Sequence, residues 1–284
     1  MKALRMRMIE DMKIRNLSEN TQKRYVYHVA KFAKYFGRSP DLLGAEEVRE
    51  YQVHLIEERH LSASTLNVTV CALRFLYRVT LRRQGVVERI YYAKSEKRLP
   101  VVLSPDEVAQ FFQSIKSFKY FALLLIPYAA GLRISEACRL KVADIDSQRM
   151  IIRIEQGKGR KDRNVMLSPR LLKVLREYWT TSRPSHWLFP GKYSGTPVSP
   201  ASARGVCHQI ALASGLKKRV TPHTLRHCFA THLLESGTEI RTIQTLLGHQ
   251  SLASTQRYTR VATTTVRQTD SPLDSVIGDR LWLS

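Results

Sequence analysis

The residues of this chain that could do chemistry are two arginines, a lysine, two histidines and a tyrosine, a set able to break a phosphodiester without a metal. They are Arg133, Lys158, His223, Arg226, His249 and Tyr258. A phosphodiester is attacked only when its anionic oxygens are neutralised, and arginine does this well because its planar guanidinium makes paired hydrogen bonds and stays charged. We therefore expect Arg133 and Arg226 to clamp one phosphate. Glu136 either orients this clamp or forms only a local ion pair.

Tyr258 is the candidate nucleophile of this set. The pKa of a tyrosine hydroxyl is ordinarily about 10, so the group needs a base or strongly cationic surroundings to lose its proton. His223, His249 and the arginines would supply both. The departing 5′ oxygen is a poor leaving group unless it is protonated, and Lys158 suits as the acid because it lies between two glycines on a turn, close to other cations.

The composition points independently to a polyanionic partner. The chain has 46 lysines and arginines against 24 acidic residues, a formal net charge of +22. Residues 1–98 hold 20 basic and 11 acidic side chains, and the remainder holds 26 and 13, so both halves carry the excess. This charge balance favours nucleic acid as the binding partner, and we expect both halves to contact a phosphate backbone.

Each assignment has an ordinary alternative. Tyr258 is one of 12 tyrosines, and only its distance from Arg226 and His249 singles it out. His223 and His227 stand four residues apart and could bind zinc, but no glutamate or third ligand accompanies them at a usual spacing. We therefore predict no metal site, and we expect His227 to pack or to face solvent.

Two apolar runs, residues 150–155 and 164–167, flank the turn that holds Lys158. Strand-like runs on either side of a short turn predict a β-hairpin, so the lysine would lie near its tip and could reach into DNA. Three more basic residues here are expected to hold the phosphate backbone, the alternative being a solvated charged turn: Arg160, Lys161 and Arg163.

A helix is expected to position His223 and Arg226. Pro222 suits the first helical position, and Gly237 is expected to end the helix. Residues three apart share a helix face, so the two side chains can converge on one phosphate. The start of the helix would also offer backbone N–H groups to an anion. A further short helix, from residue 251 onwards, is expected to carry the candidate nucleophile.

A charged stretch that ends at Pro100 marks the expected domain boundary. Residues 1–95 show helical periodicity, most clearly over 18–36 and 64–79, and predict a small all-helical domain. Residues 96–262 remain mainly helical apart from the hairpin. The predicted fold is therefore mainly α with a small β-hairpin or sheet, in two domains.

Nothing in the sequence directs the chain to a membrane or to export. Its longest apolar stretch, residues 120–130, contains a proline and is too short to span a bilayer. The cysteines show no paired spacing, so free thiols, mostly buried, are expected: Cys71, Cys138, Cys207 and Cys228. A cytoplasmic, nucleoid-associated protein is the resulting expectation.

The segments that hold the candidate residues resemble those of the tyrosine recombinases, the phage integrase family that includes the Xer proteins. The resemblance covers about residues 10–262 and rests on these matches: Gly-Leu-Arg-Ile-Ser-Glu at 131–136, Gly-Lys-Gly at 157–159, Pro-His-Thr-Leu-Arg-His at 222–227, Leu-Leu-Gly-His at 246–249 and Arg-Tyr-Thr at 257–259. A lone His-x-x-Arg would be weak, but six candidate residues in this order and at family-like spacing are a strong signal.

This resemblance implies a helical core-DNA-binding domain followed by a catalytic domain. It implies site-specific cleavage and rejoining of DNA strands through a covalent 3′-phosphotyrosyl bond at Tyr258, with Lys158 preferred to Lys161 as the acid. The phosphotyrosyl bond conserves the energy of the broken one, so no cofactor, ATP or metal is required. The lean architecture resembles the Xer and mobile-element branches, and integration, excision, transposition, cassette capture and dimer resolution all use the same residues.

The resemblance also implies partners. Exchange between two duplexes cuts four strands, so we expect a homo-tetramer on two double-stranded sites with inverted-repeat core sequences, and an accessory protein or a second recombinase could take part. The family's C-terminal segment docks on a neighbouring subunit, and residues 263–284 could do so here; an end without fixed structure is the alternative.

Three other functions are weighed against recombination. A type IB topoisomerase shares the tyrosine chemistry, but works without two specific sites. A catalytically silent DNA-binding regulator would explain the charge, but would not need all six polar groups. An RNA-binding module is weaker still because no aromatic-rich recognition segment occurs.

Overall fold

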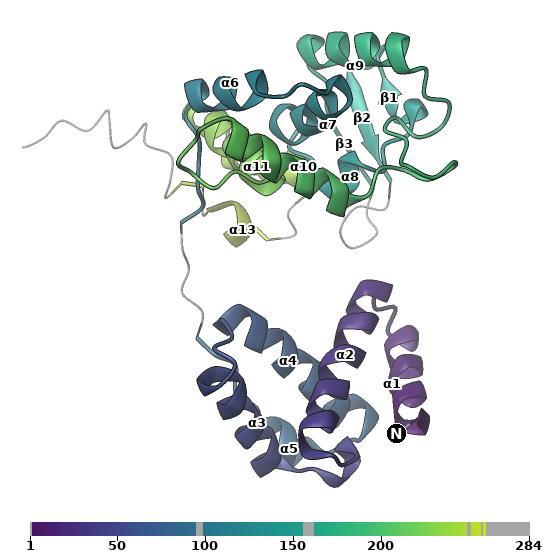
Figure 1. Cartoon of the computed structure of the whole chain (residues 1–284), viewed down its shortest axis with the longest axis vertical. Helices are drawn as coiled ribbons and strands as arrows, with labels where there is room; N and C mark the ends of the chain where they lie inside the picture. Colours follow the sequence, from purple (N-terminus) through teal and green to yellow (C-terminus); the bar gives the residue numbers. More distant parts are fainter. Residues whose placement is uncertain (1, 95–98, 156–161, 249–250, 257, 260–284) are drawn as a thin grey trace, which may run out of the picture. The chain divides into compact units, whose positions relative to one another are not determined.

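The computed structural model describes residues 2–94, 99–155, 162–248, 251–256 and 258–259 (Figure 1). The chain divides into two compact units, Met1–Lys97 and Arg98–Ser284. The sequence predicts a boundary after residue 95. The predicted end of the catalytic domain, at 262, and the predicted tail, 263–284, lie outside the described residues. No helix in the described part is long and apolar enough to cross a membrane.

The first unit is helical throughout its described part. Its elements are α1 (Lys2–Ile14), α2 (Glu19–Phe36), the 3₁₀ turn η1 (Pro40–Leu42), α3 (Ala45–Glu57), α4 (Ala63–Phe75), the π-helical turn η2 (Leu76–Thr80) and α5 (Gln84–Glu88). The helices predicted over 18–36 and 64–79 are confirmed, except that the second changes from α to π geometry after Phe75. Ser18 caps α2 through its side chain, and Gly37 follows the helix with a φ of +64°, which glycine adopts without strain.

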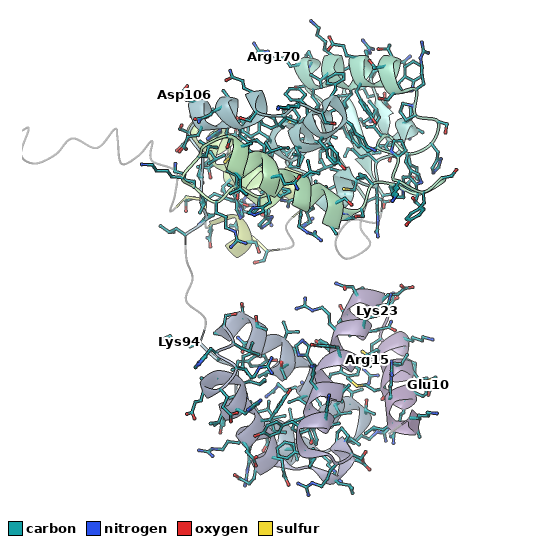
Figure 2. All side chains as sticks on the ribbon, viewed as in Figure 1. Glu10, Arg15, Lys23, Lys94, Asp106 and Arg170 are labelled. Carbon is teal, nitrogen blue, oxygen red and sulfur yellow. The ribbon has the colours of Figure 1, made fainter. Side chains whose placement is uncertain are left out.

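The core of the first unit includes the N-terminal helix. Met8 and Met12 of α1 are buried together with Phe32 of α2 and Leu73 of α4. The basic N-terminal segment therefore packs on the helical unit. Charged side chains such as Glu10 and Lys23 are exposed at the surface of this unit (Figure 2), so the helices have the amphipathic character that their periodicity predicted.

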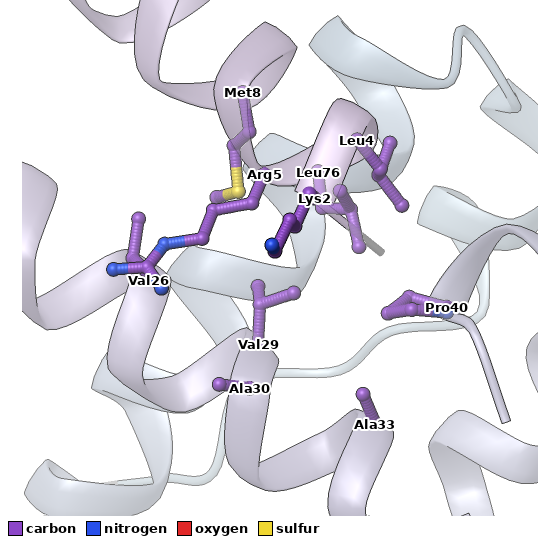
Figure 3. A pocket seen from close by; sticks show the side chains of 10 residues that line it. All are labelled: Lys2, Leu4, Arg5, Met8, Val26, Val29, Ala30, Ala33, Pro40 and Leu76. Carbon is purple, nitrogen blue, oxygen red and sulfur yellow. The ribbon is translucent and has the colours of Figure 1, made fainter. Parts of the chain in front are cut away.

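A pocket of about 250 Å³ opens between α1 and α2 (Figure 3). Apolar side chains such as Met8, Val26 and Val29 line most of it, joined by Lys2 and Arg5. None of its lining residues is a histidine, a carboxylate or a thiol.

The second unit combines helices with one small sheet. Its elements are α6 (Pro105–Gln113), α7 (Phe118–Ala129), α8 (Ile134–Ala137), η3 (Val142–Asp144), β1 (Ile145–Asp146), β2 (Ile151–Ile154), β3 (Arg163–Met166), α9 (Pro169–Ser182), α10 (Pro200–Ala213), α11 (Pro222–Glu235), α12 (Ile240–Leu247) and α13 (Ala253–Gln256). Capping side chains start several helices; Ser104 and Glu107 form the predicted capping box of α6.

The sheet contains the predicted hairpin and one further strand. β2 and β3 pair antiparallel, from Ile151 opposite Met166 to Ile154 opposite Arg163. The extra strand, β1, has only two residues and pairs with β2 on its other edge. Its length explains why alternation in the sequence did not reveal it. The connection 156–161, which holds Lys158, Arg160 and Lys161, lies outside the described residues.

Two helices organise the core of the second unit. α7 is strongly apolar, and its buried side chains contribute to the clusters on both of its sides. One cluster joins α7 to the sheet and to α9, which lies over the sheet (Figure 1). The other joins α7 to α6, α10 and α11. Three cysteines are buried free thiols, as expected, and the fourth, Cys71 in the first unit, is half-buried.

Candidate active site

Helix α11 brings three polar side chains to one face. Thr221 caps the helix by accepting a hydrogen bond from the N–H of Thr224, and the predicted proline occupies the first position. His223, Arg226 and His227 then follow at spacings of three and one, so all three lie on neighbouring positions of the same face. Arg226 and His227 are buried with most of the helix, which gives them little freedom, whereas His223 is exposed. Gly237 follows its end with a φ of +87°.

Arg226 is a buried cation with a fixed orientation. Its side chain is 1% exposed, and its two Nη atoms donate to the carbonyl oxygens of Gly131, at 2.6 Å, and Leu247, at 2.7 Å. Burial lowers the pKa of Arg226 to about 9, and the positive charge of Arg133 acts in the same direction. The group therefore stays cationic at neutral pH, held in a plane that the backbone defines.

Gly131 is required for this arrangement. Its φ is +66°, and a Cβ atom there would lie 2.5 Å from Cε1 of Phe229. Any other residue type would be strained by that backbone conformation and would force Phe229 to shift. The glycine of the Gly-Leu-Arg segment thus lets its own carbonyl reach Arg226.

Glu136 joins three arginines. Its Oε1 accepts a hydrogen bond from Nη1 of Arg133 at 2.9 Å, and its Oε2 accepts one from the backbone N–H of the same residue at 2.8 Å. Nη1 of Arg226 lies 3.8 Å from Oε2. Burial acts to raise the pKa of Glu136, but hydrogen bonds and charge from Arg163, together with those of Arg133, outweigh it and lower this pKa to about 2. The carboxylate is therefore ionised at any physiological pH.

Arg163 makes an inward contact. Its Nη1 and Nη2 donate to both carboxylate oxygens of Glu136, at 3.0 and 2.8 Å, and the side chain is 13% exposed. Its Nε lies 3.4 Å from the carbonyl oxygen of Leu246, and its Cδ would be 2.9 Å from a Cβ at Gly248. The sequence predicts a DNA phosphate as the partner of Arg163, whereas in the structure its partner is Glu136. Arg163 ties the start of β3 to α8 and to the end of α12.

Tyr258 is buried, and its hydroxyl meets a histidine. The side chain is 1% exposed and belongs to an apolar cluster with Phe229, Ile243 and Leu247. Its hydroxyl lies 3.0 Å from Nδ1 of His227. The residue stands in a turn just after α13, and not on that helix as predicted, because the helix ends at Gln256. Its N–H still donates to a carbonyl of the preceding turn.

The two histidines of α11 pack against each other. The rings of His223 and His227 lie 4.2 Å apart, centroid to centroid, at 63°. A row therefore runs from the Tyr258 hydroxyl through His227 to His223. Among the residues that the structure describes, no group of three or more histidine, cysteine or carboxylate side chains could hold a metal ion.

The described residues thus unite four of the six candidate catalytic side chains, together with Glu136. Arg133, His223, Arg226 and Tyr258 come from the start of α8, the first turns of α11 and the turn after α13. Lys158 and His249 lie outside the described residues. His227 is a contact that sequence reasoning missed. Its spacing of four from His223 was the available signal, but it was weighed only as a zinc motif.

A second basic feature occurs in the first unit. A hollow of about 670 Å³ is lined by four arginines among other residues: Arg15, Arg74, Arg78 and Arg82. Arg74 is held by the carbonyl oxygens of Val87 and Ile90, each at 2.8 Å, and it lies over the ring of Tyr92. The other three are exposed. Arg74 lies in α4, Arg78 in η2 and Arg82 just after η2, with a φ of +56°. Because all of them line the same hollow, they concentrate positive charge there.

Two family profiles match this chain. One, described as "Phage integrase family", covers residues 101–265, and the other, "Phage integrase, N-terminal SAM-like domain", covers residues 4–85. The protein y4qK of Sinorhizobium fredii, provisionally named an integrase/recombinase, is 52% identical over 275 residues, which are 96% of this chain and 89% of the relative. Tyrosine recombinase XerA of Pyrococcus horikoshii is 34% identical over 260 residues, with 90% and 88% covered.

Solved structures agree with this assignment. The crystal structure of XerA recombinase, 28% identical, covers 95% of this chain and 99% of its own at a TM-score of 0.55. A lambda integrase dimer bound to a COC′ core site, 19% identical, matches 95% and 98% at a TM-score of 0.75 and shows the shared fold. The predicted architecture, a helical core-binding domain and a catalytic domain with a small sheet, is confirmed. The chain therefore belongs to the phage integrase family and is a tyrosine recombinase, a site-specific enzyme that cleaves and rejoins strands of double-stranded DNA.

Proposed function

We propose that Tyr258 is the nucleophile of this recombinase, that Arg133 and Arg226 clamp the scissile phosphate, and that Glu136 holds the clamp in place. The observation that carries the proposal is the convergence of three separate segments. The buried hydroxyl of Tyr258 is joined to the face of α11 that carries Arg226, and Arg226 and Arg133 share one carboxylate. Such fixed cations stabilise the charge that develops on a phosphoryl group in the transition state.

In the proposed reaction, Oη of Tyr258 attacks the phosphorus and the bond from phosphorus to O5′ breaks. Lys158 gives its proton to the departing oxygen, and His223 and His249 donate hydrogen bonds to the phosphate. The product is a 3′-phosphotyrosyl bond and a free 5′ hydroxyl. A 5′ hydroxyl from the partner strand then attacks the same phosphorus and releases the tyrosine, so no cofactor takes part.

We further propose that both units contact the duplex. In the first unit the arginine-lined hollow offers exposed guanidinium groups for phosphates. In the second unit Arg160 and Lys161 would contact the backbone beside the cleaved bond. The XerH recombinase, a structural neighbour, is bound to a palindromic difH substrate, which supports a core site with inverted repeats. Exchange of four strands calls for a homo-tetramer on two such sites.

Two parts of the assembly follow from the same proposal. The tail, 263–284, would dock on a neighbouring subunit of the tetramer and couple the active sites. An accessory protein or a second recombinase could join the complex. The working location would be the nucleoid, where the chromosomal and mobile DNA lies.

Covalent trapping tests the proposed nucleophile. Purified protein is incubated with nicked duplexes made from the DNA around its own gene, and the protein-linked 3′ ends are sequenced. Wild-type protein should give ends that cluster at one inverted-repeat sequence. The adduct accumulates because the nick lets the short fragment that carries the free 5′ hydroxyl diffuse away, which stops religation. Tyr258→Phe should give no linked ends.

Tyr178→Phe is the matched control, since Tyr178 is equally buried in the second unit but packs in a different cluster. It should trap DNA as the wild type does. Linked ends that persist in Tyr258→Phe would refute the assignment, and scattered ends that depend on Tyr258 would favour a topoisomerase over a site-specific enzyme.

A further inference from the structure

The hydroxyl of the proposed nucleophile does not lie in a solvent-exposed position. Tyr258 is 1% exposed, and His227 is 8% exposed. A tyrosine that attacks a phosphate must lose its proton, and a buried hydroxyl cannot pass that proton directly to bulk water. It needs a fixed acceptor within hydrogen-bond reach.

We propose that His227 accepts the proton of Tyr258 during strand cleavage, and this inference rests on the proposed role of Tyr258 as nucleophile. Nδ1 of His227 lies 3.0 Å from Oη of Tyr258, within the range over which a general base acts. A phenolic hydroxyl carries one hydrogen, and the neutral imidazole with its hydrogen on Nε2 offers a lone pair at Nδ1. The bond between the two is then a donation from the tyrosine.

The step balances without a further reactant. The Oη–H bond breaks and an Nδ1–H bond forms on His227. In the same step Oη bonds to phosphorus and the phosphorus–O5′ bond breaks. The departing oxygen takes a proton from the acid, the role proposed for Lys158. When the 5′ hydroxyl of the partner strand attacks, its proton passes to the acid that was deprotonated in the first step. His227 returns its own proton to the departing tyrosine.

The surroundings favour the charge that this step creates on the tyrosine. Attraction between Arg226 and the ionised hydroxyl of Tyr258 is one of the influences that act to raise the pKa of Arg226. Because such an attraction is mutual, the guanidinium stabilises the phenolate as it forms. His223, whose ring centroid is 4.2 Å from that of His227, is the next group along the same row.

The same helix contains a contrasting histidine. Nε2 of His232 lies 2.9 Å from the carbonyl oxygen of Leu103, and its Nδ1 lies 3.2 Å from the hydroxyl of Tyr128. A carbonyl can only accept, so Nε2 must donate there. These bonds link α11 to α7 and to the segment before α6, and they involve neither Arg133 nor Arg226. His232 is therefore a matched control for the loss of a histidine from α11.

The test measures single-turnover formation of the protein–DNA adduct on a nicked duplex that carries the site recovered by trapping. His227→Ala should cleave about 100-fold or more slowly, the usual contribution of a general base, while binding the same duplex as tightly as the wild type. Added imidazole should restore part of the rate in proportion to its concentration. His232→Ala should gain nothing from imidazole.

His227→Asn separates proton acceptance from simple positioning. The asparagine can hold a hydrogen bond near the place of Nδ1 but cannot take up a proton, so it should cleave as slowly as His227→Ala; it also serves if the alanine variant does not fold. A rate within about threefold of wild type in either variant, well short of the loss expected of a general base, overturns the proposal. The proposal is also overturned if His227→Asn is fully active and added imidazole does not raise the cleavage rate of His227→Ala. Absence of any adduct with wild-type protein would instead refute Tyr258 as nucleophile.

Discussion

Two groups of arginines in this molecule differ in how firmly they are held. In the second unit, Arg133, Arg163 and Arg226 surround one carboxylate, and backbone carbonyls fix the most buried of them. In the first unit, Arg78 and Arg82 line an open hollow and are exposed to solvent. One group is oriented by the fold, and the other remains free to adjust to a partner.

This difference matches two demands of DNA chemistry. A cation that stabilises a transition state works best when it is already oriented and partly desolvated, because no reorganisation is then needed during the reaction. A cation that attracts a duplex acts over longer distances, tolerates motion and is weakened by salt. We infer that the buried group serves catalysis and the exposed group serves binding.

Replacement of Arg226 should have the largest effect. Arg226→Lys keeps the charge but cannot bond to both Gly131 and Leu247 while it faces a phosphate. We expect cleavage to fall by about 10²–10³-fold or more, the cost of losing one oriented donor, with little change in DNA affinity. Adduct formation and filter binding on the same duplex measure the two quantities. A loss of DNA affinity as large as the loss of cleavage rate would contradict the distinction between the buried arginines and the exposed ones.

Replacement of Glu136 should lower stability at neutral pH. Glu136→Gln leaves buried arginines without their shared carboxylate, and loss of one partner from a buried ion pair costs about 3–5 kcal/mol. Glu155→Gln is the control, since its ion pair with Lys141 is at the surface and should contribute under about 1 kcal/mol. Urea unfolding of the three proteins measures the difference.

The same carboxylate predicts how stability depends on pH. Folding lowers the pKa of Glu136 to about 2, so its contribution is fully present above the ordinary glutamate pKa of about 4.3 and is lost as the pH falls from there towards 2. The difference in the free energy of unfolding between wild type and Glu136→Gln should therefore become smaller over that interval. If this difference stayed constant between pH 5 and about pH 2.5, the interval over which linkage predicts the change, the assigned ion pairs would be contradicted.

Replacement of Gly131 should have a smaller effect on stability. Gly131→Ala combines a φ of +66° with a Cβ 2.5 Å from Phe229, and we expect a loss of about 2–4 kcal/mol from strain and overpacking together. Gly215 has a φ of +70° with nothing within 4 Å of a Cβ, so Gly215→Ala measures the destabilisation that comes from the positive φ alone. Thermal unfolding should show Gly131→Ala as the less stable of the two variants. The reverse order would show that a Cβ at residue 131 is not destabilised by Phe229.

The smallest effects should come from the exposed arginines. Arg78→Ala and Arg82→Ala should each reduce the slope of log affinity against log salt by about one, since each removes about one phosphate contact. Cleavage of the DNA that remains bound should proceed at the wild-type rate. Titrations at several salt concentrations measure the slope. An unchanged slope in both variants would exclude the hollow as a DNA contact.

The local parts of this structure could be predicted from sequence. The repeating apolar residues of α2, the glycine-containing hairpin and the Pro222 start of α11 are each set by neighbours within a few positions. The change to π geometry after Phe75 and the two-residue strand β1 leave no comparable pattern, because they depend on packing around them. The position of Tyr258 beyond α13 was missed because helix ends are the least certain feature of a periodic pattern.

The contacts within the candidate site depend on the tertiary fold. Arg163 reaches Glu136 across 27 residues of sequence, and Tyr258 reaches His227 across 31. The charged turn gave no sign that Arg163 contacts Glu136, and the spacing of His227 from His223 did not indicate that Tyr258 is its partner. Residue types and spacing predicted which side chains could act, whereas only the fold showed that Arg163 faces inward and that His227 holds the tyrosine.

The most direct test of the account is to identify the residue that carries the DNA. Wild-type protein is trapped on the nicked duplex, the complex is digested with protease and nuclease, and the nucleotide-modified peptide is sequenced by mass spectrometry. We predict a single modified tyrosine, Tyr258. Modification of any other of the 12 tyrosines, with Tyr258 unmodified, would contradict the proposed active site.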